Sequence, residues 1–245
     1  MNEKEFEIRN KLMIRKLGKN KSLKHLSTRW IMESSVFEYS YHFSWLGRPI
    51  IQFPQDIIAV QEIMWKIKPD LIIETGIARG GSLILSASIL ELIGKGRVIG
   101  IDIDIHKENR RKIEHHPLAK RIILIEGSSI DQSVVKKVHK IAKGKKRIMV
   151  MLDSNHTHEH VLKELQSYSE LVTKGSYLIV FDTIIDDITK KIQKKLVKGK
   201  WSSGNSPKSA VVEFLNQTKR FVVDKEIENK LLITVAPHGY LKCIK

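Results

Sequence analysis

Two aspartates follow strand-like apolar runs and could hold a metal ion. Asp153 comes after residues 148–152, and Asp182 comes after residues 176–181. The carboxyl ends of parallel strands lie at one edge of a sheet, so both carboxylates are expected in one cleft, where they repel each other unless a cation or proton lies between them. Oxygen ligands without cysteine favour Mg²⁺ or a similar divalent ion. His156, in the same turn as Asp153, is then a candidate general base. Alternatively, one acid caps a helix and the other turns a loop.

A second metal-ligand pattern overlaps the first. The segment His156–His160 (HTHEH) matches His-x-x-Glu-His, the inverted zinc-protease pattern, and would place two histidines four residues apart on one helix face. The pattern is short and follows a strand in what is expected to be a parallel nucleotide-binding architecture. A zinc protease would not place its ligands there, so the aspartate site is the preferred interpretation.

A glycine-containing turn after the first predicted strand has the spacing of a nucleotide-binding unit. The apolar run 71–73 ends on Glu74, glycines and a segment of helical length follow, and a second strand ends on Asp102, about 20 residues beyond the glycines. Glycines let a ligand approach the backbone, the helix N-terminus offers free N–H groups, and the acid can accept two ribose hydroxyls. An ordinary turn between strand and helix is the alternative.

The same turn distinguishes between cofactors. A dinucleotide fingerprint has glycine where this chain has Ala78, and Glu74 would repel a pyrophosphate but could hold an ammonium group. S-adenosylmethionine (SAM) therefore fits better than NAD. A third strand, 121–126, precedes two serines that are candidates for the adenine side of the pocket. The predicted cofactor-binding residues are Glu74, Thr75, Gly76, Gly80, Gly81, Ser82, Asp102, Ser128, Ser129 and Asp153.

The alternation of strands and helices predicts an α/β protein of the Rossmann-like class I methyltransferase type. Five strand–helix units are followed by two closely spaced strands, which indicates a mostly parallel seven-stranded sheet with an antiparallel last strand. The strands are expected at residues 71–74, 97–101, 121–126, 148–152, 176–181, 220–224 and 231–235.

The chain is expected to form one catalytic domain, residues 56–245, preceded by a basic and aromatic helical extension, residues 1–55. Residues 1–24 are predicted to be a basic arm that is helical or partly disordered. The aromatic-rich segment Trp30–Trp45 is expected either to pack as core or to cover a substrate cleft. A helix over 56–66, with Asp56 as its N-cap, leads into the first strand.

The charge of the chain favours anionic partners. With 43 Lys and Arg against 27 Asp and Glu, the net charge is +16. Basic clusters lie at Lys4–Arg29, Lys136–Arg147 and Lys190–Lys200, and solvated surfaces are the plain alternative for them. The last cluster belongs to a stretch, 184–207, that is long enough to be a mobile lid. The single Cys243, the charged first residues and the lack of a long apolar run predict a cytoplasmic protein, with peripheral contact at the inner face of the membrane as an option.

Five segments carry a resemblance to a known family: ETGIARGGSL, VIGIDID, VMLDSNHTHEHVLKELQSYSELVTKGSYLIVFDT, GNSPKSAVVEFL and LLITVAPHGYLK. They resemble the cephalosporin hydroxylase and rhamnosyl O-methyltransferase family over roughly Ser27–Lys242. The resemblance implies the class I SAM-dependent fold and methyl transfer to a hydroxyl, often on a sugar of a glycolipid or natural product, assisted by Mg²⁺.

The resemblance also implies roles for site residues. Related macrolide-sugar O-methyltransferases have an Asp-x-x-His element after strand four and a Glu-Asp pair after strand five. Carried over, Asp153 and Asp182 are metal ligands and His156 is the base. The Glu position holds Phe181 here, which leaves the site one carboxylate short. Besides water, the groups that could complete it are Asp186 and Asp187.

These features predict a SAM-dependent O-methyltransferase that uses Mg²⁺ and acts on a sugar hydroxyl of a glycolipid, surface polysaccharide or natural product. Lipopolysaccharide assembly or another lipid biosynthetic process is the expected setting, and a homo-oligomer is an option. Two alternatives stay open. A nucleic-acid methyltransferase is favoured by the charge, although the chain shows no separate RNA-binding module, and a noncatalytic SAM-binding protein is favoured by Phe181.

Overall fold

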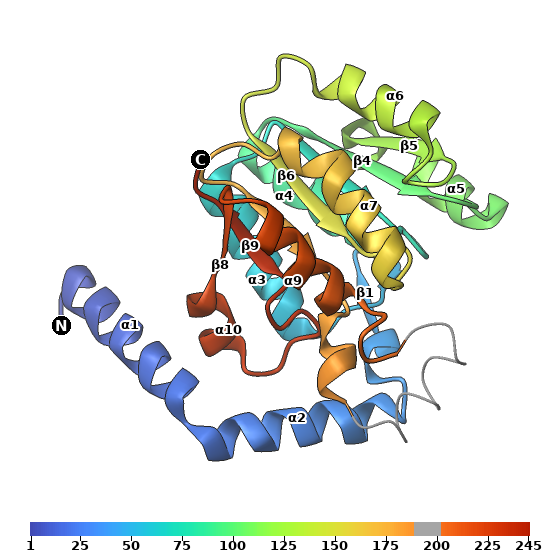
Figure 1. Ribbon diagram of the computed structural model, residues 1–245. Helices are drawn as coiled ribbons and strands as arrows, with labels where there is room; N and C mark the ends of the chain where they lie inside the picture. The colour runs from blue at the N-terminus through green and yellow to red at the C-terminus, as the bar shows by residue number, and fades with distance from the viewer. Residues whose placement is uncertain (189–201) are drawn as a thin grey trace.

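The computed structural model describes residues 1–188 and 202–245, and its centre is a seven-stranded sheet in the order β5-β4-β3-β6-β7-β9-β8 (Figure 1). The neighbouring strands β5, β4, β3, β6 and β7 all run parallel, whereas β9 is antiparallel to both β7 and β8. The predicted α/β class and the mostly parallel sheet with an antiparallel last strand are confirmed. The strands are β3 Leu71–Thr75, β4 Arg97–Asp102, β5 Ile122–Glu126, β6 Ile148–Leu152, β7 Tyr177–Val180, β8 Phe221–Val223 and β9 Tyr240–Cys243.

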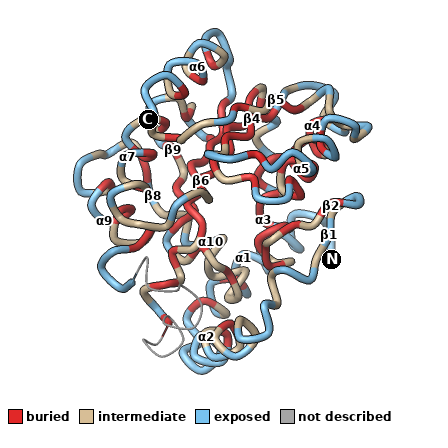
Figure 2. The backbone as a smooth tube through the Cα atoms, turned by 90° about the vertical axis from the view of Figure 1, so that its right-hand side faces the viewer, coloured by how far each residue is buried: buried red, intermediate tan, exposed pale blue. Residues whose placement is uncertain are grey.

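Helices cover both faces of the sheet because its central strands are apolar on both sides. In β3, Leu71 and Ile73 pack with α6, α7 and α9, whereas Ile72 packs with α3, α4 and α5. The buried residues accordingly follow the strands through the middle of the molecule (Figure 2). The helices are α3 Pro54–Ile67, α4 Gly81–Ile93, α5 Lys107–Glu114, α6 Gln132–Ala142, α7 His158–Tyr168 and α9 Pro207–Gln217; short 3₁₀ turns are η2 Ala119–Arg121 and η3 Ser169–Leu171.

Two helices precede this unit, α1 Glu3–Lys19 and α2 Lys21–Ser35, and they lie on the outside of the sheet and its covering helices (Figure 1). Asn20 separates them, because its side chain caps α2 by accepting a hydrogen bond from Leu23 N at 3.0 Å. The predicted basic arm is therefore helical. α1 packs on α10, Lys225–Leu231. The division of the chain at residue 55 stays a prediction.

The aromatic segment then forms a cluster beside the sheet. The rings of Trp30 and Tyr39 lie 4.8 Å apart, and those of Tyr39 and Phe43 lie 5.0 Å apart. Phe53, just before α3, joins the same cluster at 5.9 Å from Trp30. This packing fixes the 3₁₀ turn η1 Tyr39–His42 and the hairpin of β1 Phe43–Trp45 and β2 Arg48–Ile50 against the domain.

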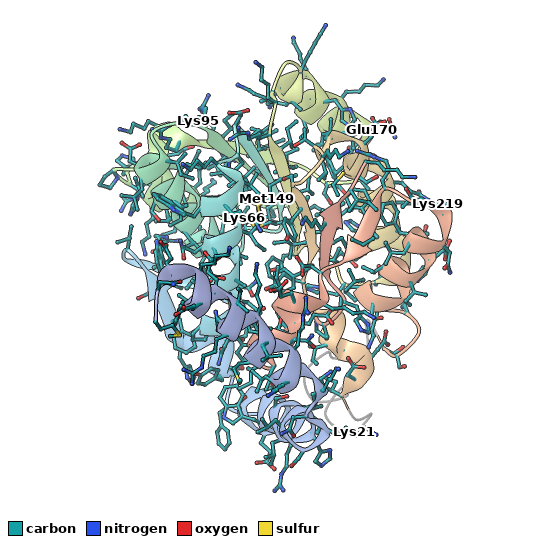
Figure 3. All side chains as sticks on the ribbon, turned by 90° about the vertical axis from the view of Figure 1, so that its left-hand side faces the viewer. Lys21, Lys66, Lys95, Met149, Glu170 and Lys219 are labelled. Carbon is teal, nitrogen blue, oxygen red and sulfur yellow. The ribbon has the colours of Figure 1, made fainter. Side chains whose placement is uncertain are left out.

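Basic side chains are spread around the molecule. Lys21, Lys66, Lys95 and Lys219 lie on separate parts of the view in Figure 3. The lid predicted over 184–207 begins as the 3₁₀ turn η4, Thr183–Asp187, but its Lys190–Lys200 cluster lies outside the described residues. Among the helices of residues 1–188 and 202–245, none has the length and apolar character that a membrane crossing needs.

The structure corrects two predictions about the end of the chain and the start of α3. Residues 231–235 do not form a strand: α10 ends at Leu231, Leu232 has a left-handed φ of 56°, and the last strand is Tyr240–Cys243. Asp56 is not the N-cap of α3, which is Phe53. The two errors have one physical cause, because Asp56 points into the core and binds the segment that was predicted to pair as a strand.

The buried carboxylate of Asp56 fixes that C-terminal segment. It accepts hydrogen bonds from Thr234 Oγ1 at 2.5 Å, Tyr240 Oη at 2.6 Å and Val235 N at 3.0 Å. Burial raises the pKa of Asp56 to about 6, although these donors oppose the shift. A backbone N–H that binds Asp56 is not available to a neighbouring strand, which accounts for the irregular path of 232–239.

Gly76 allows the two loops that build the site to touch. Its φ is +78°, and a Cβ there would lie 2.1 Å from the carbonyl oxygen of Asp153. The backbone N–H of Asp153 in turn donates to Thr75 O at 2.9 Å. The loops after β3 and β6 therefore meet, which places the cofactor turn beside the metal candidates.

We expect Gly76→Ala to destabilise the protein by roughly 3 kcal/mol or more, because a positive φ and a steric clash add. Gly175→Ala is the matched control: its φ is +82° but nothing lies within 4 Å of the added Cβ, so about 1–2 kcal/mol is expected. Urea unfolding of both variants measures the difference. Equal losses would contradict the close contact of the two loops.

We expect the stability of the wild type relative to Asp56→Asn to fall as pH rises from about 4 to about 7. The folded pKa of Asp56, about 6, lies above the ordinary 3.8, so folding favours the protonated acid and the advantage is lost as pH passes the folded pKa. The change should approach roughly 3 kcal/mol at about 1.4 kcal/mol per unit of pKa. Unfolding curves at several pH values measure it, and a pH-independent difference would refute the raised pKa.

Candidate functional site

Asp153, His156 and Asp182 form a group that could hold a metal ion. The two aspartates are the predicted ligands at strand ends, and His156 is the predicted base. Each offers one ligand atom, and these atoms all lie within 4.8 Å of one another. Asp153 follows β6 and Asp182 follows β7, its parallel neighbour, while His156 lies in the turn before α7. His156 Nε2 is 3.5 Å from Asp182 Oδ2.

The electrostatics of the group favour a cation. Burial raises the pKa of Asp153 well above its usual range, and the nearby charges of Asp182 and Glu74 raise it further. One polar contact opposes the shift: Gln52 Nε2 donates to Asp153 Oδ2 at 3.0 Å. A divalent ion would supply the positive charge that these carboxylates lack. Gln52 was not found by sequence reasoning, because a lone glutamine before α3 carries no motif.

Asp186 and Asp187, which were suggested to complete the metal site, form hydrogen bonds and an ion pair with other residues. Phe181 is buried in the apolar core next to Asp153. Asp186 accepts hydrogen bonds from Ser206 Oγ at 2.5 Å and Gly204 N at 3.0 Å, and Asp187 pairs with Lys208 at 2.6 Å. Among residues 1–188 and 202–245, two carboxylates are therefore left as ligands with the imidazole of His156 beside them, which suits a hard ion whose remaining positions are taken by water or substrate.

The residues of the zinc-protease pattern have separate partners. His158 binds Ser209 on α9, His160 binds Ser129 after β5, and His156 belongs to the metal group. The two histidines of the pattern, His156 and His160, therefore do not share a zinc site, and the structure gives the pattern no support.

A cavity of about 170 Å³ lies at the carboxyl ends of the parallel strands and collects four predicted cofactor residues. Gly76, Asp102, Ser128 and Ser129 all line it. Asp102 Oδ2 accepts a hydrogen bond from Ile77 N at 2.9 Å, which fixes the glycine turn. Since a carboxylate has about four acceptor positions, Asp102 can still accept from ribose hydroxyls.

Glu74 lies at a smaller neighbouring cavity of about 20 Å³, which Asp153 and Gln52 also line. Ser82 Oγ donates to one of its carboxylate oxygens, and the other oxygen is buried without a partner in the described chain. Burial raises the pKa of Glu74 to about 8. An ammonium group such as that of SAM could supply the missing donor.

The remaining predicted cofactor residues position the turn. Thr75 is a fully buried residue at the end of β3. Gly80 is the left-handed N-cap of α4, and Gly81 begins that helix. A Cβ on Gly81 would lie 2.2 Å from Pro49 O, so this glycine lets the β1–β2 hairpin close over the helix N-terminus.

A third cavity, of about 290 Å³, opens beside His156 and Asp182. Its walls carry both polar and apolar side chains. The N-terminal extension contributes to them, so the aromatic segment both packs as core and covers a cleft. Burial raises the pKa of Tyr41 in this wall, and the charge of Asp182 adds to the shift. The apolar and aromatic wall residues are Ile31, Tyr41, Ile51, Phe53, Ile184, Ile185, Ile188 and Val235, and the polar ones besides His156 and Asp182 are Ser35, Glu38, Ser40 and Gln52.

Comparison with known proteins agrees with this arrangement. The family model described as Rhamnosyl O-methyltransferase/CmcI matches residues 37–244. The Rhamnosyl O-methyltransferase of Mycobacterium tuberculosis (strain ATCC 25618 / H37Rv) is 31% identical over 194 residues, which cover 76% of this chain and 72% of that protein. The protein of the same name from Mycobacterium leprae (strain TN) is 31% identical over 146 residues, covering 57% and 60%.

Solved structures share the fold at low sequence identity. A CmcI structure with Mg and SAM gives a TM-score of 0.59 at 18% identity and covers 84% of this chain and 78% of that one. The MycE methyltransferase of mycinamycin biosynthesis, with Mg and SAH, gives 0.51 at 15% identity and covers 88% and 55%. The predicted resemblance is confirmed: the chain belongs to the Rhamnosyl O-methyltransferase/CmcI family and is a SAM-dependent O-methyltransferase.

Proposed function

We propose that this enzyme methylates a hydroxyl of a deoxysugar such as rhamnose, with a divalent cation at the acceptor. The observation that carries the proposal is the position of the Asp153, His156 and Asp182 group, which borders both the cofactor side and the cavity of about 290 Å³. The names of the curated relatives support a rhamnosyl acceptor. The acceptor can be a free small molecule or a glycolipid.

The acceptor cavity suits a single sugar unit. Its volume is at the small end of ligand pockets, which start at about 300 Å³. Its isoleucine and valine walls can cover the apolar side of a deoxysugar, while Asp182 and His156 offer the polar groups that fix a hydroxyl.

The residues have distinct proposed roles. Bound SAM supplies an electrophilic methyl group, and its ammonium and ribose would be held by Glu74 and Asp102. A bound divalent cation supplies Lewis acidity that eases loss of a proton from a hydroxyl. Asp153 and Asp182 would hold this cation. His156, 3.5 Å from Asp182, would accept the proton of the acceptor hydroxyl.

The acceptor is tested by incubating the protein with labelled SAM and glycolipid or glycan extracts of the source cell, followed by sugar analysis. A methylated deoxyhexose is expected. Methyl label in RNA, lost together with RNA binding at high salt, would instead support the nucleic-acid alternative.

Three further statements stay predictions. They are contact with an anionic membrane, a role in lipopolysaccharide or lipid biosynthesis, and homo-oligomer formation.

We expect Asp153→Asn and Asp182→Asn to weaken Mn²⁺ binding by more than about tenfold, because each removes a charged ligand. Asp186→Asn is the matched control, since Asp186 binds Ser206 and Gly204 instead. Electron paramagnetic resonance of free Mn²⁺ measures the affinities. Unchanged binding in both site variants would eliminate this metal site.

We expect His156→Ala to slow methyl transfer by about 10²–10⁴-fold, the usual contribution of a positioned base. His158→Ala is the control on the same turn of the protein, because its ring binds Ser209 and Glu213 instead. Turnover of the acceptor identified above measures both. Undiminished activity of His156→Ala would remove the base from the mechanism.

We expect Glu74→Gln to weaken binding of S-adenosylhomocysteine by about 10–100-fold, because a charge-assisted hydrogen bond to its ammonium is lost. The ammonium should also ionise Glu74, whose pKa is about 8 without a ligand, so binding to the wild type at pH 7 should release a proton. Calorimetry in two buffers with different ionisation enthalpies measures this proton, which should be missing in Glu74→Gln. Equal proton release in both proteins would contradict the assigned contact.

A further inference from the structure

A chain of hydrogen bonds runs beneath the cofactor cavity and takes no part in the proposed proton transfer. Glu164 on α7 is fully buried, and Ser154 Oγ donates to its Oε1 at 2.7 Å. Ser154 Oγ is also 3.3 Å from His160 Nε2, and the same ring nitrogen is 3.0 Å from Ser129 Oγ. Ser129, Ser154 and His160 all line the cavity of about 170 Å³.

The buried acid sets the direction of these hydrogen bonds. A carboxylate only accepts, so Ser154 gives its single hydroxyl hydrogen to Glu164. Ser154 Oγ can then only accept from His160, which requires a hydrogen on Nε2. Glu164 Oε1 itself lies 3.6 Å from this nitrogen, on the side where an N–H would point. The other oxygen, Oε2, is buried without a partner in the described residues, so the acid depends strongly on Ser154.

The direction of hydrogen-bond donation is fixed at Ser129 as well. The N–H of His160 also faces Ser129 Oγ, so Ser129 accepts this hydrogen bond and its own hydroxyl hydrogen is left for a ligand. The backbone of Ser129 is held as well, because the buried Tyr168 donates its hydroxyl to Ser129 O. Ser129 therefore presents a donor from a fixed position in the cavity wall.

We infer that Glu164, Ser154 and His160 are positioning residues that hold Ser129 as a hydrogen-bond donor to an acceptor nitrogen of the adenine ring. The inference rests on the proposed binding of SAM at this cavity. Adenine has acceptor nitrogens at N1, N3 and N7, whereas hypoxanthine carries a hydrogen on N1. A donor with a fixed direction selects for a base that keeps its acceptor at the contacted position, because an unpaired buried donor costs free energy.

The test compares S-adenosylhomocysteine with its hypoxanthine, 3-deaza and 7-deaza analogues, each of which lacks one acceptor nitrogen. Calorimetry should show that the wild type binds at least one analogue roughly fivefold or more weakly than the parent compound. In Ser129→Ala and His160→Phe this penalty should fall below about twofold. His160→Gln should retain it, because the glutamine amide can donate from a position close to that of Nε2.

His158→Ala is the matched control, since this histidine on the same helix binds Ser209 and Glu213 and should keep the full analogue penalty. If the wild type binds all three analogues as tightly as S-adenosylhomocysteine, the inference is overturned. If His160→Phe still bound the analogue as weakly as the wild type does, the inference would also be overturned. Ser129 would then donate to the base without the hydrogen bond from His160. If the wild type does not bind S-adenosylhomocysteine at all, the proposed function fails instead.

A measurement on the wild type does not depend on how the variants fold. Nitrogen-15 spectra of the histidine rings distinguish a protonated from a bare Nε2, and the signal missing in His160→Gln assigns His160. We expect a protonated Nε2. A bare Nε2 would reverse the chain, make Ser129 donate to the histidine, and overturn the inference.

Discussion

Buried carboxyl groups without matching cations are the constraint on which the site depends. Glu74 and Asp153 lie at the ends of neighbouring strands, and burial raises the pKa of each. Asp182 adds a further acid 3.5 Å from His156. This local excess of acidic groups contrasts with the net charge of the whole chain, which is +16. Two cations can balance it, an ammonium at Glu74 and a divalent ion between the aspartates, so the electrostatics of the site match both expected ligands.

The fold brings these acids together through parallel register and one close loop contact. Glu74 pairs with Met151 across β3 and β6, and Gly76 then lets the loop after β3 touch the backbone of Asp153. On the outer side, the extension closes the site with the hairpin against Gly81 and with Gln52 on Asp153. The residues that precede the sheet in sequence thus complete a site that the strands begin.

Local patterns were sufficient for most of the sheet and for the acids at its edge. Short apolar runs that end on Glu74, Asp102 and Asp153 predict both the strands and the position of their side chains, because strand ends define an edge. Contacts between distant segments were not predictable in the same way. The run 231–235 has the composition of a strand, but its backbone binds Asp56, and the 240–243 tail is the strand instead. Gln52 and Glu164 belong to no motif, and His160 was found only through the zinc-protease pattern, since the roles of all three arise from packing.

The most direct test of the cation account is a crystal structure grown with Mn²⁺ and S-adenosylhomocysteine, with anomalous scattering recorded to locate the metal. We expect one anomalous peak within bonding distance of Asp153 and Asp182, and the ligand's ammonium beside Glu74. A ligand bound at Glu74 with no anomalous peak between the two aspartates would contradict it.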